Sequence, residues 1–166
     1  QPYNPDLDFG TGDFCVMGWA IMPAQRGDIF KRSDGDLSFF VEARADLSPS
    51  AINFRLIDSG NYSDTFPTVA FPTNTWAFFS IVRRSGVVEQ YVNGSLLSST
   101  SNTRDLSRVN STLSLGVGVG RNFAGGSLAL FRISGTAPTA DQIAKIYNDE
   151  KFLFQDSAKA TLTGSS

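Results

Sequence analysis

The stretch TWAFFSIVRRSGVVEQYVNGSLLS, residues 75–98, decides the fold. It contains two apolar runs rich in β-branched and aromatic residues, which favour strands. An Arg-Ser-Gly sequence separates the runs, and the second run ends at Asn93-Gly94. Asn-Gly supplies the two residues of positive φ that a type I′ hairpin turn requires. The stretch therefore predicts consecutive antiparallel strands, with Trp76 at the start of the first and Tyr91 near the end of the second.

Similar runs recur along the rest of the chain. Apolar and polar residues alternate in 37–42 and 52–57, as in strands that bury one face. Segments rich in Ser, Asp, Gly and Pro separate the runs and have the composition of turns. The pattern predicts a sandwich of antiparallel strands over residues 14–22, 28–32, 37–44, 52–58, 68–71, 76–83, 87–92, 113–119 and 128–134.

The run 14–19 is apolar at every position, so we expect both faces of this strand to be covered and Cys15 to be a buried thiol. A helix is predicted after Thr139, where Thr139 and Gln142 form a capping box. Ile143, Ile146 and Tyr147 then share one face of the helix. We expect this apolar stripe to pack on the edge of the sandwich.

Composition limits the size of the fold and its partners. The chain has 166 residues, 41% of them hydrophobic, which fits one domain with a substantial core. We assign that domain to residues 1–151 and expect residues 152–166, which drift into small polar residues, to form a connector or tail. The net charge of −2 leaves no basic footprint for nucleic acid. No apolar run approaches the roughly 20 residues of a membrane span, so a membrane is not an expected partner.

Missing residue types argue against an enzyme. The chain contains no His, which excludes Ser-His-Asp and Cys-His catalysis. Glycosidases need two carboxyl groups flanking one bond, and retaining enzymes hold them about 5 Å apart. Glu42 and Glu89 instead stand alone on their predicted strands, where we expect solvated side chains. An enzyme that acts on polysaccharide therefore remains the least favoured alternative.

Short motifs across residues 7–149 resemble laminin G-like and pentraxin-like domains, which are jelly rolls of the concanavalin A-like superfamily. The motifs are Leu7-Asp8-Phe9-Gly10, Asp13-Phe14, Trp19, Trp76, Tyr91-Val92-Asn93-Gly94, Leu115-Gly116 and the strand that follows Gly126. The resemblance implies an all-β fold: an antiparallel two-sheet jelly-roll sandwich with one short C-terminal helix. It also implies binding rather than catalysis. Residues 141–166 are similar to segments of tailed-phage virion proteins, which implies an extracellular or virion location.

The loop predicted at 61–71 is the best candidate for a ligand site, because rings lie among hydrogen-bonding groups there. We expect Asn61, Tyr62, Asp64 and Phe66 to bind the ligand. The alternative for Phe66 is a place in the core beneath the loop. Sugar recognition by this loop would use the rings with their polar neighbours.

The resemblance also implies calcium at the rim of the sandwich, held by Asp8 and Asp13 among the acidic residues there. Many relatives have an aspartate in the strand after Gly126, where this chain has Leu128-Ala129-Leu130. The inherited site therefore lacks one carboxylate.

Together these features favour a noncatalytic adhesion or recognition module of a larger extracellular or phage virion protein. Its expected partner is a surface glycan or another virion or cell-surface protein, including a neighbouring subunit of the same parent protein. The alternative is a purely architectural domain that decorates a capsid or tail.

Overall fold

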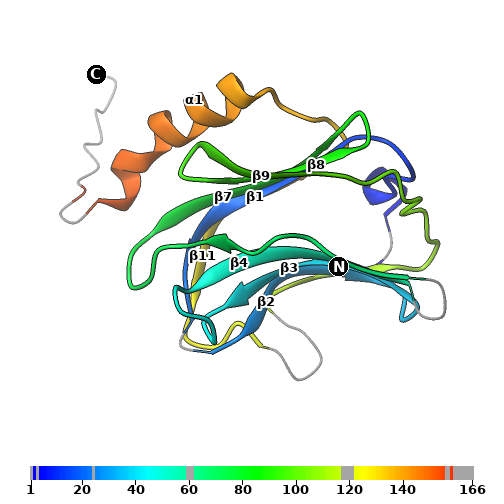
Figure 1. Cartoon of the computed structure of the whole chain (residues 1–166), viewed down its shortest axis with the longest axis horizontal. Helices are drawn as coiled ribbons and strands as arrows, with labels where there is room; N and C mark the ends of the chain where they lie inside the picture. The colour runs from blue at the N-terminus through cyan, green and yellow to red at the C-terminus, as the bar shows by residue number, and fades with distance from the viewer. Residues whose placement is uncertain are drawn as a thin grey trace, which may run out of the picture.

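The computed structural model describes residues 2, 4–23, 25–58, 62–116, 122–155 and 158, without the side chains of Leu37 and Tyr62. These residues form two antiparallel sheets packed face to face, with the helix α1 (Ala140–Glu150) outside one of them (Figure 1). This arrangement confirms the predicted all-β sandwich with one short C-terminal helix. The helices among the described residues are all too short or too polar to cross a bilayer.

The first sheet has the strand order β11-β1-β7-β8-β9 among the described residues. Its tight turns follow the expected chemistry, since Asn93 and Gly94 have φ of 49° and 78° between β8 and β9. Ser85 and Gly86, with φ of 49° and 75°, form a second turn of the same kind between β7 and β8. The strands are β1 (Phe14–Ile21), β7 (Ala77–Arg84), β8 (Val87–Val92), β9 (Ser95–Ser101) and β11 (Ser127–Ser134).

The second sheet has the order β10-β2-β3-β4-β5, and the short β6 also pairs with β4. All pairings in both sheets are antiparallel. The strands are β2 (Gly27–Ser33), β3 (Leu37–Arg44), β4 (Ala51–Asp58), β5 (Tyr62–Thr65), β6 (Val69–Ala70) and β10 (Thr112–Leu115), and two short 3-10 helices are η1 (Pro5–Leu7) and η2 (Lys151–Phe154).

The main core lies between the sheets and is built largely from phenylalanine. Phe14 of β1 lies 5.9 Å from Phe39 of β3 and 5.8 Å from Phe54 of β4, measured between ring centroids. Cys15, Met17 and Trp19 point to the other face of β1 and belong to a second apolar cluster beneath α1. The expectation that both faces of β1 are covered is therefore confirmed.

The helix α1 begins where the sequence predicts, but it packs on a different part of the sandwich. Both hydrogen bonds of the capping box between Thr139 and Gln142 are present. The helix packs on the outer face of the first sheet, not on the edge of the sandwich, because Ile143 is fully buried against the outward side chains of that sheet. Trp19 fixes the end of the helix, since its Nε1 donates to Glu150 Oε2 at 2.8 Å.

Three strands differ from the sequence prediction. The first is β5, which lies within the segment predicted as a recognition loop and pairs with β4. The neighbouring β6 also pairs with β4 and falls within the strand predicted at 68–71. β9 was not predicted, because its sequence of serines and leucines lacks the usual strand pattern. The described part of β10 ends at Leu115, and residues 117–119 of the predicted strand lie outside the described residues.

Candidate functional site

A groove of about 710 Å³ opens at the side of the sandwich where β5 and the end of β9 lie near each other. β5 and β9 are the edge strands of the two different sheets. Most of the lining side chains are polar. The groove is lined by Ser63, Asp64, Thr65, Phe66, Thr100, Ser101, Asn102, Thr103 and Arg104.

Asp64 is the centre of the hydrogen-bond network in this groove. Its Oδ2 accepts from Asn102 Nδ2 at 3.1 Å and from Arg104 Nε at 3.0 Å. The Asp64 and Arg104 side chains are 30% and 47% exposed, so the ion pair faces solvent. A carboxylate of β5 is thereby joined to a guanidinium that follows β9, and the pair spans the opening between the two sheets.

The backbone beneath Arg104 is held by a fully buried arginine. Arg83 of β7 donates from Nη1 to the carbonyl of Arg104 at 2.8 Å and from Nη2 to the carbonyl of Gly10 at 2.6 Å. The Arg83 guanidinium also lies 5.1 Å from the centroid of the Phe14 ring. Further along, Leu106 is fully buried in the core. The 102–106 segment, of which residues 102–104 line the groove, is therefore held to the core at both of these points although it has no regular secondary structure.

The structure brings two of the four predicted ligand residues to this groove. Asp64 lines it directly, while Phe66 is only 3% exposed and packs 5.1 Å from Phe54, beneath the surface. Asn61 lies outside the described residues. The backbone of Tyr62 pairs with Asp58 in β5, and its side chain is not described. The binding roles of all four residues stay predictions.

Sequence reasoning missed the opposite wall of the groove. Asn102 and Arg104 follow the hydroxyl-rich run Ser98-Ser99-Thr100-Ser101, which has turn-like composition. Only the β9 pairing places that run opposite Asp64. The assembled groove offers hydroxyl, amide, carboxylate and guanidinium groups, so it can both donate and accept hydrogen bonds over an open surface.

The carboxylates predicted to hold calcium contact arginines and backbone amides. Asp8 Oδ1 accepts from Arg32 Nη2 at 3.2 Å and from the backbone amide of Arg108 at 3.0 Å. Asp13 Oδ1 accepts from the backbone amide of Ser85 at 2.8 Å. Across the described ranges, no three His, Cys, Asp or Glu side chains are grouped so as to hold a metal ion. Asp8 and Asp13 thus already accept hydrogen bonds from protein groups, and their proposed role in holding calcium stays a prediction.

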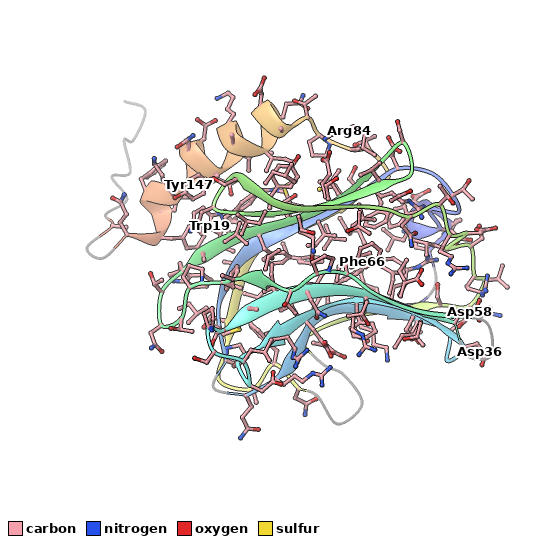
Figure 2. All side chains as sticks on the ribbon, in the orientation of Figure 1. Trp19, Asp36, Asp58, Phe66, Arg84 and Tyr147 are labelled. Carbon is pink, nitrogen blue, oxygen red and sulfur yellow. The ribbon has the colours of Figure 1, made fainter. Side chains whose placement is uncertain are left out.

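The same end of the sandwich holds further acidic residues, and Figure 2 shows Asp36 and Asp58 there. Arg108 Nη2 donates to Asp58 Oδ2 at 2.8 Å, and Arg108 Nε lies 3.9 Å from Asp34 Oδ2. A guanidinium therefore supplies positive charge among these carboxylates.

The two strand glutamates are not the solvated residues that the sequence predicts. Glu42 is fully buried, and its Oε1 accepts from Arg26 Nε at 3.0 Å. Glu89 Oε2 accepts from Tyr91 Oη at 2.7 Å and pairs with Arg84 at 3.1 Å. Burial, followed by the hydrogen bond to Glu89, raises the pKa of Tyr91 to about 12. The two glutamates thus lie on different sheets, and each forms an ion pair with a different arginine.

A family model described as the concanavalin A-like lectin/glucanases superfamily, of the laminin G type, matches residues 3–144. The chain therefore belongs to this family, which confirms the resemblance stated above. A search of curated proteins returned no match.

Solved structures share the fold at low sequence identity. The receptor binding domain of botulinum neurotoxin C/D mosaic serotype has a TM-score of 0.71 and 16% identity, and the similarity covers 90% of this chain and 39% of that one. The binding domain of Paraclostridial Mosquitocidal Protein 1 has a TM-score of 0.70 and 16% identity over 91% and 40% of the two chains. A heptameric SAP-like pentraxin from Limulus polyphemus has a TM-score of 0.57 and 15% identity over 81% and 69%. This chain thus spans about two fifths of the toxin domains that it resembles.

Proposed function

We propose that the domain is a noncatalytic recognition module that binds a surface glycan through the groove lined by Asp64, Asn102 and Arg104. One observation carries this proposal: an open groove concentrates hydrogen-bond donors and acceptors on the edge strands of the two sheets. Sugar hydroxyls donate and accept at the same time, so they complement such a mixed surface. Loops and edges on a rigid β scaffold are also where binding residues concentrate.

The similar structures support a binding role. They include toxin binding domains, and one of these, from botulinum neurotoxin DC, is in complex with SialylT; it has a TM-score of 0.63 and 15% identity over 84% of this chain and 36% of that one. We infer that the module belongs to a larger extracellular or virion protein. That protein would present the groove to a cell surface or to a neighbouring subunit.

A glycan array with the purified domain tests the proposal, with Asp64→Ala as the critical variant. Asp46→Ala is the matched control, because Asp46 also pairs with an arginine on the surface, Arg44 at 2.8 Å. We expect wild type and Asp46→Ala to bind the same glycans and Asp64→Ala to lose about tenfold in affinity, since hydrogen bonds to charged groups contribute roughly 1.5–3 kcal/mol. Equal binding by all three proteins would place the site elsewhere.

A second variant tests the predicted role of Tyr62. Tyr62→Ala should weaken glycan binding by about 1 kcal/mol if the ring stacks on a sugar, and should leave the melting temperature unchanged. Failure of the wild-type domain to bind any glycan would favour the architectural alternative, in which β5 and its surroundings contact another subunit.

A further inference from the structure

A second pocket, of about 280 Å³, lies on the opposite face of the first sheet from the main core. It forms where η2 and the end of α1 meet the start of β7 and the turn between β8 and β9. Its lining combines aromatic rings with a few polar groups, which is the usual composition of a small-molecule site. The volume is close to the lower end, about 300 Å³, of typical ligand pockets. It therefore suits a ligand of one ring.

Four aromatic side chains build one side of this pocket. The Phe154 ring of η2 lies 4.3 Å from Trp19 and 4.9 Å from Trp76, and Tyr147 of α1 stacks on Trp19 at 5.7 Å. Figure 2 shows Trp19 and Tyr147 close together between α1 and the first sheet. Trp19 is only 2% exposed, whereas Trp76 and Tyr147 are partly exposed. Trp76 and Tyr147 thus present ring surface to the pocket.

Several polar groups around these rings have no hydrogen-bond partner in the described part of the chain. Asn93 Oδ1 accepts from the backbone amide of Phe78 at 2.9 Å, but its Nδ2 donates to nothing there. The same holds for the Trp76 indole nitrogen and the Gln155 side-chain amide. By contrast, the indole nitrogen of Trp19 is satisfied by Glu150. The pocket therefore has donors and an acceptor available beside its rings.

Lys151 is the single charged residue among the side chains described as lining this pocket. Its Nζ lies 5.6 Å from the centroid of the Tyr147 ring and donates to Asn148 Oδ1 at 2.9 Å. The adjacent Glu150 accepts from Trp19 and pairs with Arg132. The pocket thus has a local positive charge in a chain whose net charge is −2. An anionic ligand is favoured over a neutral one of the same shape.

We propose that this pocket binds an acidic monosaccharide, a pyranose ring that bears a carboxylate. The ring would lie against Trp76 and Tyr147, its hydroxyl groups would bond Asn93 and Gln155, and its carboxylate would pair with Lys151. The site shares no residue with the Asp64 groove and does not depend on the function proposed for that groove.

Tryptophan fluorescence reads this pocket directly, because both tryptophans of the chain line it. The probes are methyl glucuronide and N-acetylneuraminic acid, each compared with neutral methyl glucoside, and sialyllactose then tests the same acid as a terminal residue. We expect a saturable change in fluorescence with the acids, weaker binding of the glucoside by about tenfold, and weaker binding at high salt. Absence of a saturable change with either acid, or equal binding of the glucoside, overturns the proposal.

Two lysine variants locate the charge. Lys151→Met should reduce affinity for the acids by about tenfold, while Lys145→Met, in the preceding helix α1 and paired with Asp149, should bind as wild type does. Unchanged affinity in Lys151→Met would overturn the assignment of Lys151 as the partner of the ligand carboxylate. Trp76→Ala should also lose binding, and the melting temperature of each variant verifies that it folds. Asp64→Ala should retain acid binding here, which separates this site from the groove.

Discussion

Gln90 of β8 reaches across the core to the backbone of Phe54 in β4. Its Oε1 accepts from the amide of Phe54 at 3.2 Å, and its Nε2 donates to the carbonyl of Pro67 at 2.7 Å. The contact has a topological cause. β5 pairs with β4 from residue 55 onward and β6 pairs with residues 51 and 52, so the ladder is interrupted beside Phe54. A side chain from the facing sheet replaces the missing strand partner.

Replacing this glutamine should be costly although the substitution conserves volume. Gln90→Leu leaves the buried amide of Phe54 without a partner, and we expect a loss of about 2 kcal/mol or more in the free energy of unfolding. Gln25→Leu, at an exposed position, should change it by less than about 0.5 kcal/mol. Urea unfolding measures both, and equal stabilities would show that the inter-sheet hydrogen bonds contribute nothing.

Adding a side chain at Gly94 should destabilise the protein by more than the strain of its positive φ alone. Gly94 and Gly125 have nearly the same φ, 78° and 81°, but a Cβ on Gly94 would lie 3.1 Å from Tyr147 Cδ1, whereas one on Gly125 would meet no atom within 4 Å. Gly125→Ala should therefore cost only the strain, about 1 kcal/mol, and Gly94→Ala about 1–3 kcal/mol more. Thermal unfolding of both variants makes the comparison, and Gly94→Val should be worse still. Equal losses of stability in Gly94→Ala and Gly125→Ala would mean that α1 moves aside without measurable cost.

Turn chemistry and the two-sided apolar strand were readable from sequence because each depends on local rules. Asn93-Gly94 needs only its own φ angles, and Cys15 and its neighbours needed only their unbroken apolar run. β9 was not predicted because its stability comes from pairing with β8, with Tyr91 opposite Leu96, and not from its own composition. The burial of Glu42 was also unpredictable, because it depends on Arg26 from another strand end.

The Cys15 thiol should be unreactive in the folded protein. Burial raises its pKa to about 12, and the side chain is only 2% exposed. Ellman's reagent at pH 8 should label it only at the rate of unfolding, and fully in urea. Rapid labelling of the native protein would contradict the packing of α1 over β1.

The same pKa shift predicts how stability changes at alkaline pH. The thiol titrates at about 12 when folded, against a usual value of 9.0, so its stabilising contribution is complete below pH 9 and is lost as pH rises toward 12. The raised pKa of Tyr91 has the same effect, but its contribution to stability is lost only as pH rises from the usual phenol value of 10.0 toward 12. Between pH 9 and 10 the free energy of unfolding should therefore decline in the wild-type protein but not in Cys15→Ala. Urea midpoints across this range test it, and parallel curves would contradict the assignment.

Calcium should have little effect on stability. The Asp8 carboxylate is held by Arg32 and a backbone amide, and Asp13 by another backbone amide. A ligand at one hundred times its dissociation constant adds about 2.7 kcal/mol, which would raise the melting temperature by several degrees. Melting with a chelator and with millimolar calcium should agree within about one degree, and a shift of several degrees would restore the predicted rim site.

The sequence predicted one wall of the candidate groove but not the other. Asp64 was selected because it lies among rings and acceptors, yet its partners Asn102 and Arg104 are about 40 residues away in sequence and reach it only through the arrangement of two different sheets. Phe66 could not be separated from a core residue by its neighbours alone. Its burial follows from β5 and β6 both pairing with β4, which draws the intervening segment inward.

The C-terminal boundary of the domain gives the last prediction. The sequence places it after residue 151, but beyond that point Phe154 stacks on Trp19 and packs against Trp76 in a tilted arrangement. A chain that ends at Lys151 should therefore lose about 1–3 kcal/mol relative to one that ends at Gln155, through lost ring contacts and increased exposure of Trp19. Phe154→Ala in the longer chain should reproduce most of that loss, whereas Phe152→Ala, at a ring that is 57% exposed, should not. Urea unfolding followed by circular dichroism measures all four chains. Equal stability of the two lengths would support residues 152–166 as a connector outside the domain.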